Sequence, residues 1–265
     1  MTQILQTKLP YDLSAQRPLP GIQPLDMAEW LHVDEAYLGQ MAYRGQLIAE
    51  KRDKVIGLLP EAEEPAAELL DLVLSQLASR PDFTVSAETV LRPDGQRVQI
   101  NRNDPMATLG HLVQEDLCIL QKQGDAQDGE QGGEHVLTGA VLCFPSSWTL
   151  AQKLGKPLIA IHVPVDEYDA NLAKRVQRLF DGVRLGRPLW RFNILWYGVS
   201  ELHYPRPEFD HREWVSKAEA SFLRSEKQCI LRLPQTGAAV FSIHTFMLEG
   251  DLGRALAAGP VPVAR

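Results

Sequence analysis

The sequence has few cysteines, and none of them stands in a metal-binding spacing. The three present in 265 residues, Cys118, Cys143 and Cys229, are far apart. Structural zinc sites and iron–sulfur clusters draw on Cys-x-x-Cys pairs, and a disulfide framework needs an even set of cysteines. Each of the three adjoins apolar residues, which favours a buried, reduced thiol that packs as a small hydrophobic side chain.

The chain also has no excess of positive charge and no long apolar run. The chain carries 27 Lys and Arg residues against 34 Asp and Glu residues, a formal charge of −7. No basic stripe is present to neutralise phosphates, which argues against a nucleic-acid partner. No run approaches the roughly 20 apolar residues that cross a bilayer, and residues 1–8 lack the apolar core of a signal peptide. We therefore expect a cytoplasmic protein with no membrane partner.

Common catalytic motifs are absent as well. The sequence holds no Gly-x-Gly-x-x-Gly after a strand pattern, no Walker loop, no His-Glu-x-x-His and no Gly-x-Ser-x-Gly. Nucleotide-binding, zinc-protease and serine-hydrolase functions therefore lose their usual sequence support. Hydrophobic residues make up 45% and charged residues 23% of the chain, as in an ordinary globular protein. The length fits a single domain over residues 1–265.

The N-terminal half alternates extended and helical patterns. Four prolines within residues 1–30 indicate an extended arm that wraps a core. Apolar spacing predicts helices over residues 35–52 and 65–80, followed by short strands over residues 84–102. Asp104 opens a further helix, predicted to continue to Leu120 with Asp116 on its apolar stripe. A carboxylate there must be paired, protonated or in a cavity, and pairing with backbone or an arginine is the simplest case.

The C-terminal half is rich in predicted strands. Polar residues and glycines over residues 121–134 indicate a mobile loop. Helices are predicted over residues 146–155, 169–183 and 251–258. Strands are predicted over residues 135–144, 190–199, 222–233 and 238–248, the last two joined by the turn Pro234-Gln-Thr-Gly237. This order of helices, mixed elements and a hairpin-rich sheet predicts an α+β fold.

Two of the seven histidines, His162 and His244, stand in strongly apolar stretches. An imidazole in an apolar wall suits a haem iron, which needs a neutral nitrogen ligand held by a hydrogen-bond acceptor. A core histidine bonded to a backbone carbonyl has the same sequence signature, so the pattern leaves both interpretations open. The other five histidines lie at helix starts or in polar loops, where we expect them to face solvent or to cap helices: His32, His111, His135, His203 and His211.

A row of polar side chains follows one face of the strand predicted over residues 222–233. Arg224, Glu226 and Gln228 alternate there, and Arg232 continues the series. Such a row lines a pocket or an interface, or else it forms the solvated outer face of the sheet, and the pattern allows both. Arginines in the same half, Arg191 among them, could bind anionic groups such as propionates or phosphates, although surface arginines are common.

Several blocks of the sequence, in a fixed order from about Gly21 to Leu248, together resemble one known family. They are Gly21-Ile-Gln-Pro-Leu, Trp30-Leu-x-Val-Asp34, Leu112-Val-Gln-Glu-Asp-Leu117, Phe144-Pro-Ser-Ser-Trp148, Lys153-Leu-Gly-Lys-Pro157, Ile161-His-Val-Pro-Val165, Pro188-Leu-Trp-Arg-x-Asn193, Arg232-Leu-Pro234 and Phe241-Ser-Ile-His-Thr-Phe246. The family is that of the haem-dependent oxidative N-demethylases. The resemblance covers most of the chain.

This resemblance implies a PAS-like antiparallel sheet with flanking helices and an N-terminal helical arm, forming one haem-binding domain. It implies haem b as the cofactor, with one histidine on the iron. The implied reaction oxidises a small secondary amine, such as dimethylamine, with O2 to a primary amine and formaldehyde. Electrons would come from partner reductase subunits that carry flavin and an iron–sulfur cluster.

The same resemblance suggests roles for individual residues. His162, in the Ile-His-Val-Pro-Val block, is the first choice for the iron ligand, and His244 is the second. Arg191 and Arg232 are the expected partners of the haem propionates, because a buried dianion favours guanidinium groups. Glu226 is expected to hold the ammonium group of the substrate, with Arg224 beside it on the same strand face.

Two other functions compete with the enzyme subunit. The first is a non-enzymatic haem PAS sensor or ligand-binding module, which would normally act through an output domain. The 265 residues contain no segment that looks like one, which ranks the sensor below the enzyme. The second is a scaffold that has lost haem.

Overall fold

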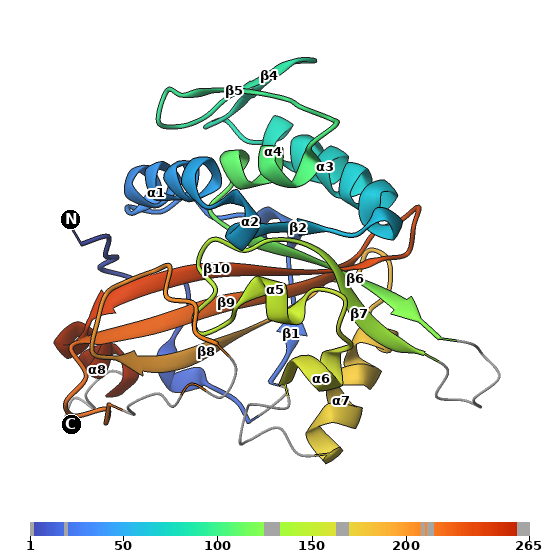
Figure 1. Ribbon diagram of the computed structural model, residues 1–265. Helices are drawn as coiled ribbons and strands as arrows, with labels where there is room; N and C mark the ends of the chain where they lie inside the picture. The colour runs from blue at the N-terminus through green and yellow to red at the C-terminus, as the bar shows by residue number, and fades with distance from the viewer. Residues whose placement is uncertain are drawn as a thin grey trace.

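The largest element of the computed structural model is a seven-stranded antiparallel sheet (Figure 1). The structure describes residues 3–18, 21–124, 133–162, 170–207, 210 and 215–258, with the backbone alone at residues 162 and 170–174. The strands lie in the spatial order β1-β8-β9-β10-β6-β7-β2. Their bounds are Gln23–Pro24 (β1), Ile56–Leu58 (β2), Asp116–Gln123 (β6), Glu134–Val141 (β7), Leu189–Tyr197 (β8), Phe222–Arg232 (β9) and Ala239–Glu249 (β10).

The five long strands of this sheet are connected in a specific topology. Numbered along the chain, they lie in the order 2-1-5-4-3, since β7 is followed across the sheet by β6, β10, β9 and β8. Three helices stand between the second and the third of these strands and cover one face, where α6 packs on β7 and α7 packs on α6 (Figure 1). They are α5 (Leu150–Lys153), α6 (Leu158–His162) and α7 (Ala170–Gly182).

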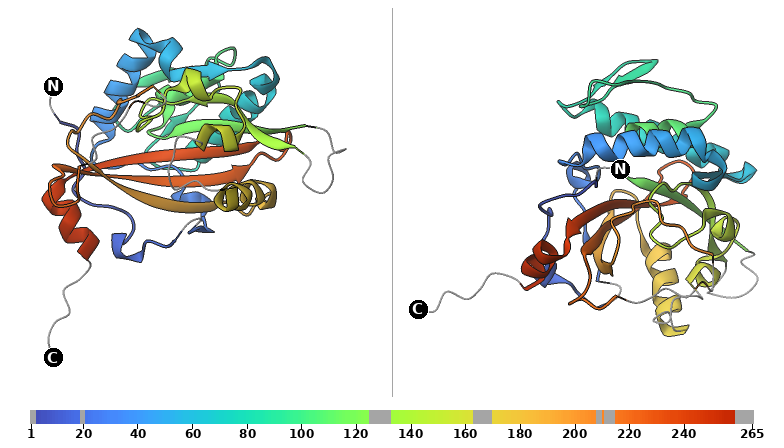
Figure 2. Two further views of the ribbon diagram at one scale, coloured as in Figure 1. Left: turned by 60° about the horizontal axis from the view of Figure 1, so that its bottom comes forward. Right: turned by 60° about the vertical axis from the view of Figure 1, so that its left-hand side comes forward.

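The opposite face of the sheet carries the N-terminal helices, so the sheet is the middle of three layers (Figure 2). These helices are α1 (Tyr37–Glu50), α2 (Arg52–Val55), α3 (Glu63–Ala78) and α4 (Pro105–Leu112). A small sheet lies on their outer side, formed by β3 (Thr84–Val85), β4 (Thr89–Leu91) and β5 (Arg97–Gln99). Three 3-10 turns, η1 (Leu13–Ala15), η2 (Met27–Glu29) and η3 (Pro60–Ala62), and the C-terminal helix α8 (Gly250–Ala258) complete the described elements. This arrangement confirms the predicted α+β class.

The helix predicted from Asp104 to Leu120 is wrong beyond Leu112. Asp104 does cap it, since its carboxylate accepts the backbone N–H of Ala107, but α4 ends at Leu112 and strand β6 begins at Asp116. Residues 117–120 are buried on both faces of the sheet, and such a doubly covered strand is a continuous apolar run. A run of this kind matches helical and strand spacing equally well, which explains the error.

The ends of the loop predicted over residues 121–134 belong to strands. Strand β6 extends to Gln123, and β7 begins at Glu134 and pairs with it. Residues 125–132 lie outside the described part of the chain. Along the described part of residues 3–30, two short 3-10 turns and the two-residue strand β1 are the regular elements.

A buried ion pair joins the helical layer to the sheet. Arg44 of α1 donates to Asp116 at the start of β6 over 2.6 Å, and both side chains are fully buried. The Asp116 carboxylate also accepts the backbone N–H groups of Cys143 and Phe144, each at 2.7 Å. The remaining donors of Arg44 bind backbone carbonyls between α4 and β6. Asp116 is therefore paired with both backbone and arginine, the simplest of the expected cases.

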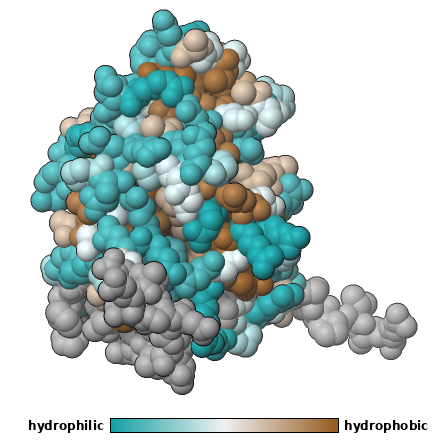
Figure 3. Space-filling model, turned by 90° about the vertical axis from the view of Figure 1, so that its right-hand side faces the viewer, coloured by the Kyte–Doolittle hydropathy of each residue, from teal (hydrophilic) through white to brown (hydrophobic). Residues whose placement is uncertain are grey.

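The outer surface shows few large apolar side chains. Hydrophilic residues cover most of the face in Figure 3, with smaller hydrophobic patches between them. Among the residues that the structure describes, the exposed large hydrophobic side chains are those of Leu38, Ile159, Leu185 and Val199. No helix in the described ranges is both long and apolar enough to cross a lipid bilayer.

We expect Asp116→Ala to destabilise the protein by about 3–5 kcal/mol, because it leaves a buried guanidinium and two buried N–H groups without their acceptor. Urea unfolding followed by circular dichroism would measure the change. Asp71→Ala is the matched control, since Asp71 forms an ion pair of similar length with Arg102 in which both side chains are more than half exposed. The control should remain within about 1 kcal/mol of the wild type. Equal effects of the two substitutions would contradict the role given to Asp116.

Candidate functional site

The polar row on β9 lies on the face of the sheet that α6 and α7 cover. The side chains of Arg224, Glu226, Gln228 and Ile230 all point to this face, because every second residue of a strand does so. Ile230 packs in one hydrophobic cluster with Leu158 of α6. The Arg224 side chain is fully buried, and Glu226 is only 6% exposed. The row is therefore internal at Arg224 and Glu226 and half-buried at Gln228, and it is not a fully solvated outer surface.

Glu226 and Arg224 form a buried ion pair, and further hydrogen bonds hold the guanidinium group of Arg224 in place. Arg224 Nε donates to Glu226 Oε1 over 2.9 Å. The other Arg224 nitrogens donate to the carbonyls of Phe144 and Leu202 and to the hydroxyl of Thr245. The guanidinium thus cannot rotate without losing several hydrogen bonds, and it holds the carboxylate in one orientation.

Two amides bind the other oxygen of the same carboxylate. Asn193 of β8 stands opposite Glu226 in the strand register, and its Nδ2 donates to Glu226 Oε2 over 2.8 Å. Asn193 Oδ1 accepts the backbone N–H of Glu226, which fixes the direction of the amide. Gln228 Nε2 is a second donor to Oε2, at 3.2 Å. Glu226 Oε1 accepts one hydrogen bond and Oε2 two, which leaves an acceptor position on Oε1.

Arg191 completes this group and has no counterion among the residues that the structure describes. Its Nη1 donates to Gln228 Oε1 over 2.9 Å, while its buried Nε has no hydrogen-bond partner in the described part of the chain. Burial lowers the pKa of Arg191, and the negative charge of Glu226 only partly opposes this effect. Two guanidinium groups and one carboxylate give the cluster a net charge of +1. A half-buried cation with a buried, unbonded N–H favours an anionic ligand.

Arg232 stands further along β9 and has different partners. Its guanidinium donates to the backbone carbonyls of Val183, Phe180 and Gly237. It thereby ties the end of α7 and the turn before β10 to strand β9. All three of its side-chain nitrogens are engaged in this way.

The first-choice iron ligand, His162, is the last residue of α6. Its side chain and residues 163–169 lie outside the described part of the structure. The preceding residue, Ile161, is buried in the same hydrophobic cluster as Ile230 and Ile243 of the sheet. The backbone at residue 162 therefore belongs to the helices that cover the polar row of β9.

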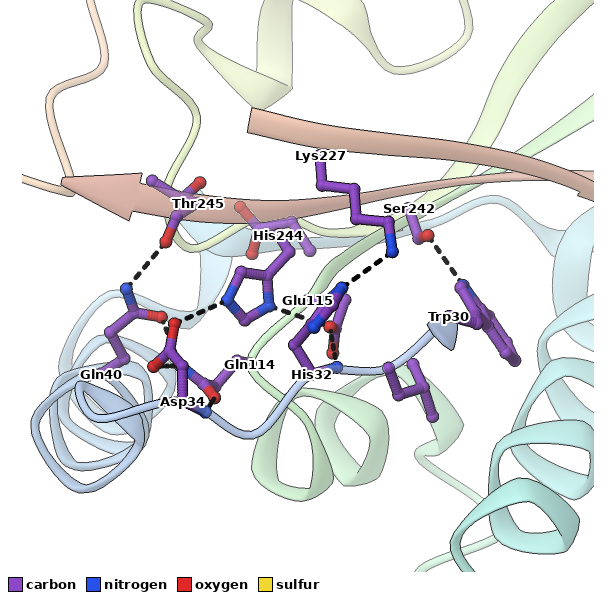
Figure 4. Close-up of polar contacts among 12 residues, drawn as sticks. Trp30, His32, Asp34, Gln40, Gln114, Glu115, Lys227, Ser242, His244 and Thr245 are labelled. Atoms are coloured by element: carbon purple, nitrogen blue, oxygen red, sulfur yellow. Dashed lines mark hydrogen bonds and ion pairs between the residues drawn. The ribbon is translucent and has the colours of Figure 1, made fainter. Parts of the chain in front are cut away.

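His244 lies on the other face of the sheet, among the N-terminal helices. Figure 4 shows its ring between two carboxylates, with Nδ1 2.9 Å from Glu115 and Nε2 3.1 Å from Asp34. Burial disfavours the charged ring, but the hydrogen bonds and charges of Asp34 and Glu115 prevail and raise its pKa to about 9. Its interactions also lower the pKa of both carboxylates. Both ring nitrogens of this imidazolium are engaged, so neither offers a lone pair.

A second pair of contacts fastens the N-terminal arm beside His244. Lys227 Nζ lies 2.9 Å from His32 Nε2 (Figure 4). It also donates to the carbonyl of Glu29. Trp30 Nε1 donates to the hydroxyl of Ser242 on β10. Burial and the neighbouring charges of His244 and Lys227 lower the pKa of His32 to about 3, so its ring is neutral. The arm is thus held to the sheet by side chains from β9 and β10.

The expectation for the remaining histidines fails at His32, whose ring packs beside Lys227 and His244, and at two further positions. His135 is 1% exposed and lies 3.1 Å from Gln177 of α7. His203 is 9% exposed, and its Nδ1 lies 2.8 Å from the carbonyl of Cys143. Both are core histidines, which their polar sequence neighbours conceal. His211 lies outside the described residues.

A family model described as "Haem-dependent oxidative N-demethylase, alpha subunit-like" matches residues 21–251. The chain belongs to this family. The match confirms the resemblance carried by the sequence blocks, and it covers both faces of the sheet together with the helices on each side. The family is haem-dependent, and its alpha-subunit name indicates an enzyme of several subunits.

The polar row of this N-demethylase-family chain fits a haem better than the His244 cluster does. Haem carries two propionates, and the uncompensated charge and free Nε of Arg191 match such an anion. The cluster around His244 balances its own charges, since Lys227 and the imidazolium stand with two carboxylates. Arg191 is therefore the described residue best suited to a haem propionate.

We expect His244 to make stability depend on pH at the alkaline side. Its pKa rises from 6.5 to about 9 in the folded protein, so its stabilisation is complete below pH 6.5 and is lost as the pH rises through 9. Urea unfolding at pH 6 and pH 9.5 should show that wild type loses on the order of 3 kcal/mol more than His244→Gln. His111→Gln is the control, because burial lowers the pKa of His111, so this histidine gives the folded protein no stabilisation that is lost at alkaline pH. Parallel pH profiles for wild type and His244→Gln would contradict this account.

Proposed function

We propose that this chain is the haem b-binding subunit of an oxidative N-demethylase that acts on a small secondary amine such as dimethylamine. The observation that carries the proposal is the cation Arg191, which has no ion-pair partner among the described residues and lies near the fixed carboxylate of Glu226. A carboxylate group would neutralise Arg191, and an ammonium ion would donate to the remaining acceptor position of Glu226 Oε1. The family match supplies the haem dependence.

We place the haem on the face of the sheet that carries the polar row of β9. There His162 would ligate the iron and Arg191 would bind a propionate. The 2-1-5-4-3 strand order, with covering helices between the second and third strands, supports a PAS-like haem site on this face. His244 and Arg232 were candidates for the same site, but we assign them to the arm and to the end of α7, because the partners described above engage their nitrogens.

The described residues would bind and orient the amine. When bound, the haem would supply the activation of O2 and the oxidation of the N-methyl group. Glu226 would accept an N–H of the substrate ammonium at the free position of Oε1, while Arg224 keeps the carboxylate in place. The burial of both side chains excludes water and strengthens these contacts.

The overall reaction sets what a partner must supply. Dimethylamine, O2, two electrons and two protons give methylamine, formaldehyde and water. The two electrons need a donor, for which we propose partner subunits that carry flavin and an iron–sulfur cluster. A non-enzymatic haem sensor on the same fold would need no such donor and would form no formaldehyde.

We expect protein produced with haem supplementation to show a Soret band that His162→Ala abolishes, since the iron would lose its nitrogen ligand. Absorption spectroscopy would measure the band, and His244→Ala is the matched variant on the opposite face, expected to retain it. Loss of the band in His244→Ala alone would reverse the ligand assignment. If the unmutated protein shows no Soret band, the haem proposal is wrong and the scaffold that has lost haem is favoured.

We further expect Glu226→Gln to weaken amine binding by roughly 10–100-fold, the range for the loss of a hydrogen bond to a charged group. Dimethylamine would be titrated into the haem-loaded protein and followed by the Soret shift. Formaldehyde formed with a chemical reductant would report turnover. Asp71→Asn is the surface control. A haem protein that neither responds to the amine nor forms formaldehyde would indicate the sensor.

A further inference from the structure

Gln228 stands between two opposite charges that do not touch. Its Oε1 accepts from Arg191 Nη1 at 2.9 Å, and its Nε2 donates to Glu226 Oε2 at 3.2 Å. Arg191 is directly opposite Gln228 in the register of β8 and β9, and Glu226 is two residues away on the same strand face. Among the described ion pairs, Glu226 is bound to Arg224 and Arg191 to none.

An amide is the side chain that suits this position chemically. It offers an acceptor at one end and a donor at the other, so it can bind a guanidinium and a carboxylate at once without adding charge. A carboxylate in its place would accept from Arg191 and neutralise it, and a shorter or apolar side chain would let Arg191 reach Glu226. Either change would give the guanidinium of Arg191 a carboxylate partner within the protein, so this charge would no longer be available to a ligand.

We propose that Gln228 is a positioning residue, a neutral spacer that keeps Arg191 free for a carboxylate and Glu226 free for an ammonium group. This inference deepens the proposed function and rests on it for the identity of both ligands. The part that concerns Arg191 and Glu226 depends only on the contacts between described residues. Gln228 touches neither ligand and acts through the two charged groups.

The surroundings of Gln228 make a carboxylate at this position easy to follow. The charged groups that face it are Arg191 from β8 and Glu226 and Arg224 from β9. Its partner on β10 is the apolar Ile243. A carboxylate introduced here would therefore pair with Arg191 when ionised, and at acidic pH it would regain a proton and again leave the guanidinium free.

The test compares Gln228→Glu with Gln228→Met and with Gln99→Glu, a control that makes the same chemical change at an exposed position of β5. Haem transfer to excess apomyoglobin, followed in the Soret region, reports haem retention. For Gln228→Glu we expect haem loss roughly tenfold faster than in wild type at pH 7, and a smaller difference between the two rates at pH 5. Gln228→Met should lose haem faster than wild type at both pH values. The control should match wild type throughout.

Thermal unfolding of the haem-free proteins provides a readout that needs no ligand. Gln228→Glu gives Arg191 a counterion, which it lacks among the described residues, but it also replaces the donor to Glu226 Oε2 by a like charge. Glu226 is already paired with Arg224, so we expect the attraction to Arg191 to prevail and the unfolding midpoint at pH 7 to rise by about 2–4 °C. A purely structural glutamine would give lower stability with and without haem. Faster haem loss combined with a more stable haem-free protein is therefore the expected signature of the spacer.

The outcomes separate this inference from the proposed function. If wild type takes up haem and Gln228→Glu retains it equally well, the spacer role is wrong. If wild type takes up no haem, the haem proposal fails, and the thermal unfolding midpoints of the haem-free proteins then test the spacer role of Gln228. A higher midpoint in Gln228→Glu than in wild type supports this role, and an unchanged or lower midpoint overturns it. If Gln228→Glu does not fold, haem retention equal to wild type in Gln228→Met also overturns it.

Discussion

The site depends on the carboxylate of Asp116, although Asp116 lies outside it. This carboxylate binds Arg44 and the N–H groups of Cys143 and Phe144. The carbonyl of Phe144 in turn accepts from Arg224, which orients Glu226. A single buried acceptor therefore fixes the corner between β7 and α5, and that corner helps to fix the cation of the polar row. Buried polar groups of this kind are stable only when every partner is present.

Strand β9 separates two charged clusters by the alternation of its side chains. Glu226 and Gln228 face α6 and α7, while Lys227 between them faces the N-terminal arm. The cluster that includes Lys227 balances its charges within the protein, whereas the polar row keeps a net positive charge. Since an uncompensated charge with little access to water is unfavourable, this difference is the physical basis for proposing a ligand on the face of the polar row.

Much of the site was predictable from spacing along the chain. The strands of the C-terminal half and the common face of Arg224, Glu226 and Gln228 follow from residue alternation, and the structure confirms both. The burial of that face was not predictable, because a solvated strand shows the same alternation. Asp116 was misplaced on a helix because a strand covered on both sides has no distinctive period.

The sequence by itself determined the α+β class, the positions of four of the five long strands (β7, β8, β9 and β10) and the family, since each depends on local patterns or on blocks of residues. Only the tertiary structure decided the partners of the ionisable groups. His244 lies between Asp34 and Glu115, which are 210 and 129 residues away, and Arg191 lacks the counterion that Arg224 has. The charge state of a buried group depends on which atoms surround it in space, and spacing along the chain does not specify these atoms.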